Sequence, residues 1–69
     1  MERIKIHTEF IKLSQLLKWA NIAETGAAAN HMIMEGLVKV NGETELKRGR
    51  KIYPGDLVEV DQAGSFLVE

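Results

Sequence analysis

The chain has 69 residues, no cysteine and a formal net charge of −1, with 45% hydrophobic and 28% charged residues. A chain of this length buries only about 60% of its unfolded surface, so we expect one domain over residues 1–69 with a small core and no disulfide or thiolate–metal site. No apolar run approaches the roughly 20 residues of a membrane helix, and the N-terminus lacks the apolar stretch of a signal peptide, so a cytoplasmic location is expected.

The N-terminal third is predicted to form a strand and then a helix. Ile4 and Ile6 alternate with polar residues in the stretch RIKIHT, which is the period of a half-buried strand. From residue 13 four apolar residues recur at helical spacing, namely Leu13, Leu16, Leu17 and Ala20. Asn21 is expected to end this helix, and Trp19 is expected to cover the rim of the core.

A second helix is predicted to follow directly. Thr25 suits the N-cap position, because its hydroxyl can accept a hydrogen bond from a free backbone N–H, although Ala28 does not supply the Glu or Gln of a capping box. Gly36 suits the C-terminal cap, where the backbone turns left-handed. One face of the helix is expected to carry Ala29, Met32, Ile33 and Gly36.

The rest of the chain is predicted to form strands joined by turns. Asn41-Gly42 separates two strand-like runs, which is the strongest short hairpin signal. Pro54-Gly55 marks a further turn, and the strand-like runs LVEV and SFLVE follow it. This order predicts an α+β fold, in which two short tandem helices pack beside a small, mostly antiparallel sheet. The terminal strands are expected to pair with each other or with the sheet edge.

Positive charge is concentrated in one segment, residues 47–51, which we call the basic loop. Its cations are Lys47, Arg48, Arg50 and Lys51, and no Lys or Arg follows them. Lys and Arg neutralise RNA phosphates and release counterions, and Arg also forms bidentate contacts and stacks on bases. The basic loop is therefore a candidate phosphate-binding site, and the alternative is a solvated turn.

Residues 13–60 resemble the S4 RNA-binding domain, also called the alpha-L RNA-binding motif. The resemblance is carried by the pattern Gly-x-Val-x-Val-Asn-Gly from Gly36 to Gly42, and by Pro54-Gly55-Asp56 behind a pair of helices. The stretches TGAAA and KRGRK resemble the short stand-alone bacterial members. The resemblance implies a core motif of about residues 12–60 with a strand added at each end. It also implies binding of structured RNA, commonly ribosomal or transfer RNA, without catalytic activity or a cofactor.

The resemblance also implies which residues meet the RNA. Lys12 matches the basic residue that opens the first helix, and Thr25 matches the small hydroxyl residue at the start of the second. Gly26, Asn30 and His31 occupy positions in that helix where larger members carry basic residues. The basic loop of the family is matched by Arg48, Arg50 and Lys51. Because the second helix here lacks Lys and Arg, the basic loop is expected to supply a larger share of the RNA contacts than is usual.

The start of the second helix offers a further way to bind a phosphate. The side chains from Thr25 to Ala28 are small, so the backbone N–H groups at the positive end of the helix dipole are expected to be open to an anion. The alternative reason for small residues here is close packing between the two helices.

Other functions have less support in the sequence. His7 and His31 lack the partners and spacing of a metal site, and no nucleophile–base pair or phosphate loop is present, so an enzyme is not expected. A small protein-interaction adaptor using Trp19, Met34 and Tyr53 is the main alternative. A β-grasp sulfur carrier acts through a C-terminal Gly-Gly, whereas this sequence has FLVE there, so that class of protein is not favoured. We expect a monomer whose partner is structured RNA, with no membrane or small-molecule ligand.

Overall fold

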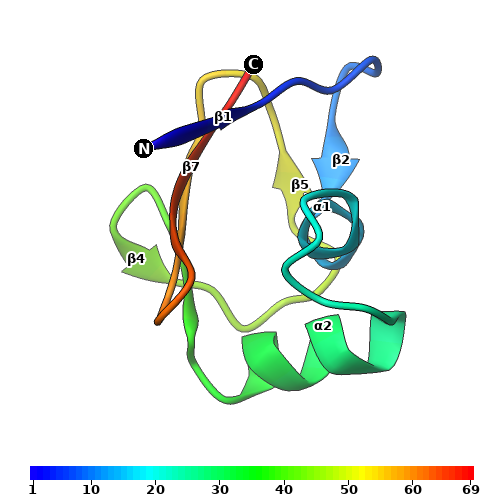
Figure 1. The fold of residues 1–69 in the computed structure, drawn as a ribbon, viewed down its shortest axis with the longest axis vertical. Helices are drawn as coiled ribbons and strands as arrows, with labels where there is room; N and C mark the ends of the chain where they lie inside the picture. The colour runs from blue at the N-terminus through cyan, green and yellow to red at the C-terminus, as the bar shows by residue number, and fades with distance from the viewer.

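The fold combines a five-stranded sheet with two helices that lie to one side of it (Figure 1). The computed structural model describes all of residues 1–69. The strand order is β1-β7-β6-β3-β4, and every neighbouring pair is antiparallel except β1 with β7. The strands are β1 Glu2–Ile4, β3 Val38–Val40, β4 Glu43–Thr44, β6 Leu57–Val60 and β7 Gly64–Val68. The predicted α+β fold is confirmed, and so is the pairing of the terminal strands with each other.

A separate two-stranded ribbon lies beside the first helix. It joins β2 Ile11–Lys12 to β5 Lys51–Ile52 in antiparallel fashion. In Figure 1 these two strands run next to each other above α1. The sequence pattern does not predict this ribbon, because strands of two residues are too short to show an alternation.

The helices are α1, Leu13–Trp19, and α2, Gly26–Met34. Both end in the same kind of cap, since Asn21 after α1 and Gly36 after α2 have positive φ of 60° and 78°. In each case the N–H groups of this residue and of the next donate to carbonyls of the last turn, which is the Schellman motif. The predicted helix ends at Asn21 and Gly36 are confirmed.

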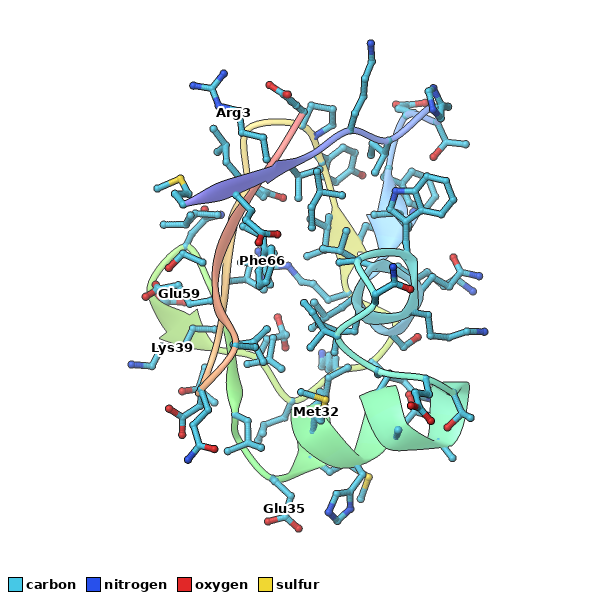
Figure 2. All side chains as sticks on the ribbon, in the orientation of Figure 1. Arg3, Met32, Glu35, Lys39, Glu59 and Phe66 are labelled. Carbon is cyan, nitrogen blue, oxygen red and sulfur yellow. The ribbon has the colours of Figure 1, made fainter.

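The core lies between the helices and the sheet. Figure 2 shows Met32 of α2 and Phe66 of β7 pointing into this layer. All the residues that are buried are hydrophobic. They are Ile4, Ile6, Leu13, Leu16, Leu17, Ala23, Ala29, Ile33, Val38, Val40, Ile52, Val58, Val60, Phe66 and Val68.

The N-terminal segment is a shorter strand than RIKIHT predicts, because β1 ends at Ile4. The predicted alternation nevertheless holds, since Ile4 and Ile6 are both buried. Beyond β1 the N–H of Ile6 still donates to the Glu69 carbonyl, at 2.8 Å. Trp19 is 56% exposed, and its indole N–H donates to the Lys5 carbonyl at 3.2 Å, so it connects the end of α1 to this segment.

The β3–β4 hairpin turns at Asn41-Gly42, as predicted, with both residues at positive φ. The side chain of Asn41 continues beyond the hairpin: Nδ2 donates to Asp56 Oδ1 at 3.1 Å, and Oδ1 accepts the Leu57 N–H at 2.9 Å. The other oxygen of Asp56 accepts the Tyr53 N–H at 2.8 Å. These bonds fix the Pro-Gly turn to the hairpin, and so position the end of β5 and the ribbon.

Candidate RNA-binding surface

The carboxylate of Glu45 organises the basic loop from its N-terminal side. Its Oε2 accepts the backbone N–H groups of Leu46 at 3.1 Å and Lys47 at 3.2 Å, while its Oε1 lies 2.6 Å from Nη1 of Arg50. The hydrogen bond from Arg50 is the main reason why the pKa of Glu45 is lowered, and the pKa of Arg50 is raised in return. One acidic side chain therefore closes the loop on itself.

The start of α1 holds the loop from the other side. The N–H groups in the first turn of a helix have no partner within the helix. Here the N–H of Leu13 donates to the Arg50 carbonyl at 2.8 Å, and that of Ser14 donates to the Arg48 carbonyl at 3.1 Å. The loop backbone is thus fixed by a helix and a carboxylate together, which restricts where its side chains can point.

Three of the four cations in the basic loop are free of ion pairs. Lys47, Arg48 and Lys51 have no acidic partner, whereas Arg50 is paired with Glu45. Lys12, the N-cap residue of α1, lies directly opposite Lys51 in the ribbon and is also unpaired. Like charges at opposed strand positions repel each other, so an anion between these two lysines would relieve an unfavourable contact.

A groove of about 610 Å³ separates the basic loop from α2. Asn30 and Met34 line one side, and Leu46 with the first four loop residues line the other. The Oδ1 atom of Asn30 is buried and has no hydrogen-bond partner. The structure therefore brings Asn30 to the loop, as the resemblance implied. Figure 1 shows the segment between β4 and β5 passing close to both helices.

The structure does not bring His31 to this groove. Its Nε2 lies 3.7 Å from Oε1 of Glu35, the C-cap residue of the same helix, and neither residue lines the groove. Figure 2 shows Glu35 at the edge of the molecule, pointing away from the sheet. His31 and the basic loop therefore face different surroundings.

The start of α2 is only partly open to an anion. The hydroxyl of Thr25 accepts the Ala28 N–H at 3.0 Å, which confirms the predicted N-cap but removes one of the expected free donors. The N–H groups of Gly26 and Ala27 have no partner in the chain. A Cβ at Gly26 would meet nothing within 4 Å, so packing between the helices does not require glycine there.

Two aromatic residues adjoin the basic loop, and the sequence analysis identified only one of them. The ring centroids of Phe10 and Tyr53 are 5.8 Å apart, and Nζ of Lys51 lies 4.9 Å from the centre of the Phe10 ring. Phe10 has no local sequence signal for this contact, because its partner is 43 residues away. The signal that indicates it is the mirrored order of aromatic residue, isoleucine and lysine in FIK and KIY, which suits an antiparallel pair.

The rest of the surface mixes charges of both signs. Lys39 and Glu59 are opposed across β3 and β6, and Figure 2 shows both pointing outward from the sheet. A shallow hollow of about 440 Å³ near them is lined mainly by polar residues. No three His, Asp or Glu side chains are grouped as metal ligands would be. Neither helix has the length and apolar content needed to cross a membrane.

Comparison with known proteins agrees with the resemblance to the S4 RNA-binding domain that the signature residues show. The family model described as S4 domain matches residues 4–69. The chain is 46% identical over 65 residues to "Probable ribosome maturation protein RlbA" of Bacillus subtilis, covering 94% of this chain and 92% of that protein. It is 37% identical over 51 residues to "Small ribosomal subunit protein uS4m" of Schizosaccharomyces pombe, covering 74% of this chain but 16% of that protein. The chain belongs to the S4 domain family.

Proposed function

We propose that this chain binds structured RNA without catalysing a reaction, and that the RNA is ribosomal or a precursor of it. The observation that carries the proposal is a group of unpaired cations on a fixed backbone: Lys12, Lys47, Arg48 and Lys51. A fixed array of cations releases phosphate counterions without first losing much conformational freedom. The names of the two relatives, which refer to ribosome maturation and to a ribosomal subunit, favour ribosomal over transfer RNA.

The four basic residues of the loop have different roles in this proposal. Lys47 and Arg48 are exposed and contact phosphates directly. Arg50 is mainly a positioning residue, because Glu45 holds one end of its guanidinium. The other N–H groups of Arg50 can contact a phosphate only in the orientation of the guanidinium that this ion pair fixes.

The groove beside α2 extends the same surface. An RNA strand held by Lys47 and Arg48 would run past Asn30, which lines the opposite side of the groove. The free N–H groups of Gly26 and Ala27 offer a further, weaker contact for a phosphate. His31 is not included in the proposed surface, since it pairs with Glu35 away from the groove.

The adaptor alternative rests on the exposed side chains of Trp19, Met34 and Tyr53. Met34, which is 76% exposed, lines the groove together with Leu46, and both lie there among unpaired cations. A site of this composition suits a polyanion with exposed bases better than an apolar protein surface.

The test compares two double variants in a filter-binding assay with ribosomal RNA. Lys47→Ala with Arg48→Ala removes two cations from the loop. Arg3→Ala with Lys39→Ala removes the same two residue types from surfaces elsewhere on the sheet. We expect the first variant to bind much more weakly and the second to bind almost as the wild type does.

The salt dependence provides the quantitative part of this prediction. Four phosphate contacts give a slope of roughly −3 in a plot of log affinity against log salt, at about −0.7 per contact for single strands. The loop variant should lose about 1.4 of that slope, and the control should lose little. Equal slopes for both variants would refute the assignment of the loop.

A further inference from the structure

We infer that the β2–β5 ribbon carries a stacking site for one unpaired RNA base, with Tyr53 as the platform. The inference rests on the proposed RNA binding and names a second contact next to the basic loop. Bases without a Watson–Crick partner are the part of an RNA that proteins most readily stack on aromatic side chains. The ribbon provides an aromatic surface and positive charge on the same face.

The register of the ribbon determines which side chains share this face. Ile11 is opposite Ile52, and both pack against the core, Ile52 being fully buried. Successive side chains of a strand point to opposite sides, so the residues that flank each isoleucine point outward. These residues are Phe10 and Lys12, which flank Ile11 of β2, and Lys51 and Tyr53, which flank Ile52 of β5.

The contacts within this face leave Tyr53 as the available ring. Phe10 is half-buried, and the ammonium of Lys51 lies 4.9 Å from the centre of its ring. Tyr53 is 42% exposed and meets Phe10 at a centroid distance of 5.8 Å with a tilt of 48°. Phe10 thus supports the tyrosine from the side, while the exposed part of Tyr53 has no aromatic partner.

The backbone of Tyr53 is held in place before any ligand arrives. Its N–H donates to Asp56 Oδ2 at 2.8 Å, and its carbonyl accepts the Asp56 N–H at 3.0 Å. It also precedes Pro54, which restricts it to extended conformations. Both oxygens of the Asp56 carboxylate already accept hydrogen bonds, one from the Tyr53 N–H and one from the Asn41 side chain.

The position of the ribbon connects the stacking site to the basic loop. Lys51 is both the last residue of the loop and the neighbour of the aromatic pair. A strand whose phosphates lie along Lys47, Arg48 and Lys51 therefore passes directly by Tyr53. Stacking needs no particular base, because every base has a π-face, so this contact favours unpaired over paired RNA rather than one sequence over another.

The test uses an RNA hairpin with a single-stranded adenosine tail and the same hairpin with a blunt end. Wild type should bind the tailed RNA more tightly, and Tyr53→Ala should reduce that affinity by roughly 5- to 150-fold, the range of one base–aromatic stack. Tyr53→Phe keeps the ring and should retain the preference. The salt slope should be the same in all three proteins, since no charge changes.

A spectroscopic measurement reports on the ring itself. The chain has one tyrosine, so incorporation of 3-fluorotyrosine gives a single ¹⁹F signal. That signal should shift when the tailed hairpin is added and should move much less with the blunt one. An unmoved signal, together with full affinity of the Tyr53→Ala protein for the tailed hairpin, would overturn the stacking site alone.

The same hairpin measurements give a different result if the proposed RNA binding itself is wrong. If the wild-type protein binds neither hairpin at low salt, both the RNA-binding proposal and the stacking site fail. If it binds both hairpins equally and loses them equally in the Lys47→Ala, Arg48→Ala protein, the loop assignment stands and the stacking site fails. Thermal unfolding of the Tyr53→Ala protein by circular dichroism controls for loss of fold.

Discussion

Asn41 shows what a signature residue of this family does in the folded chain. It adopts a φ of 52° in the hairpin turn, a region that suits Asn or Gly. Its backbone N–H donates to the Leu57 carbonyl at 2.8 Å. Its side-chain amide donates to Asp56 and accepts the Leu57 N–H. The Asn of the Val-Asn-Gly pattern thus has a structural role, and Asn41 need not touch RNA.

Replacing Asn41 by Ala should lower the free energy of unfolding by about 1–3 kcal/mol, because it removes two side-chain hydrogen bonds and places Ala at a positive φ. Asn41→Gly loses the same bonds but tolerates the backbone conformation, so it should cost less. Urea unfolding followed by far-ultraviolet circular dichroism measures both variants. A loss below about 0.5 kcal/mol for Asn41→Ala would show that the side chain is not a structural tie.

At the scale of the elements, the conformation of the basic loop depends on the Glu45 carboxylate, which accepts hydrogen bonds from Leu46, Lys47 and Arg50. The ion pair with Arg50 lowers the pKa of this carboxyl below its ordinary value of 4.5. A lowered pKa means that the ionised form is favoured in the folded chain. Its contribution to stability is therefore present above the ordinary pKa and is lost as the pH falls through the folded value.

Glu45→Gln removes this titration and weakens the contact to Arg50. At neutral pH the variant should be less stable than the wild type. The difference in the free energy of unfolding should shrink as the pH falls from 4.5 through the lowered pKa at which the folded wild-type carboxyl loses its charge. Urea unfolding at a series of pH values checks this. A difference that stays constant well below that pH would mean that the ion pair does not stabilise the fold.

The elements differ in how well the sequence predicts them. The helix ends at Asn21 and Gly36, the hairpin at Asn41-Gly42 and the N-cap at Thr25 all depend on residues close together in the chain, and each is predicted correctly. The pairing of β2 with β5 depends on residues about 40 positions apart and leaves no local signal. Tertiary contacts of this kind are beyond periodicity and turn chemistry.

The candidate site, like the fold, is predictable from the sequence only in part. The run KRGRK is visible in the sequence, and its placement beside Asn30 follows from the family pattern. The pairing of Arg50 with Glu45, which distinguishes Arg50 from the unpaired cations of the loop, does not follow from the sequence. Nor does the sequence show that the first turn of α1 holds the loop carbonyls, since those bonds join backbone atoms of distant residues.

At the scale of the whole molecule, charge is distributed unevenly although the net charge is only −1. Arg3 lies 3.9 Å from Glu69, and Lys39 is opposed to Glu59, so cations on the sheet have acidic neighbours. The basic loop instead brings together three cations without an ion pair, Lys47, Arg48 and Lys51, and Lys12 lies directly opposite Lys51. An acidic remainder disfavours weak contacts with RNA elsewhere, so one surface should dominate the binding.

The central claim is that RNA binds at the basic loop and the adjoining ribbon. The most direct test is a titration of the ¹⁵N-labelled protein with the tailed hairpin, followed by backbone amide chemical shifts. Signals of residues 47–51, Lys12 and Tyr53 should shift most, while those of Lys39 and Glu59 on the outer face of the sheet should stay in place. Shifts concentrated on β3 and β6, with the loop signals unmoved, would contradict the account.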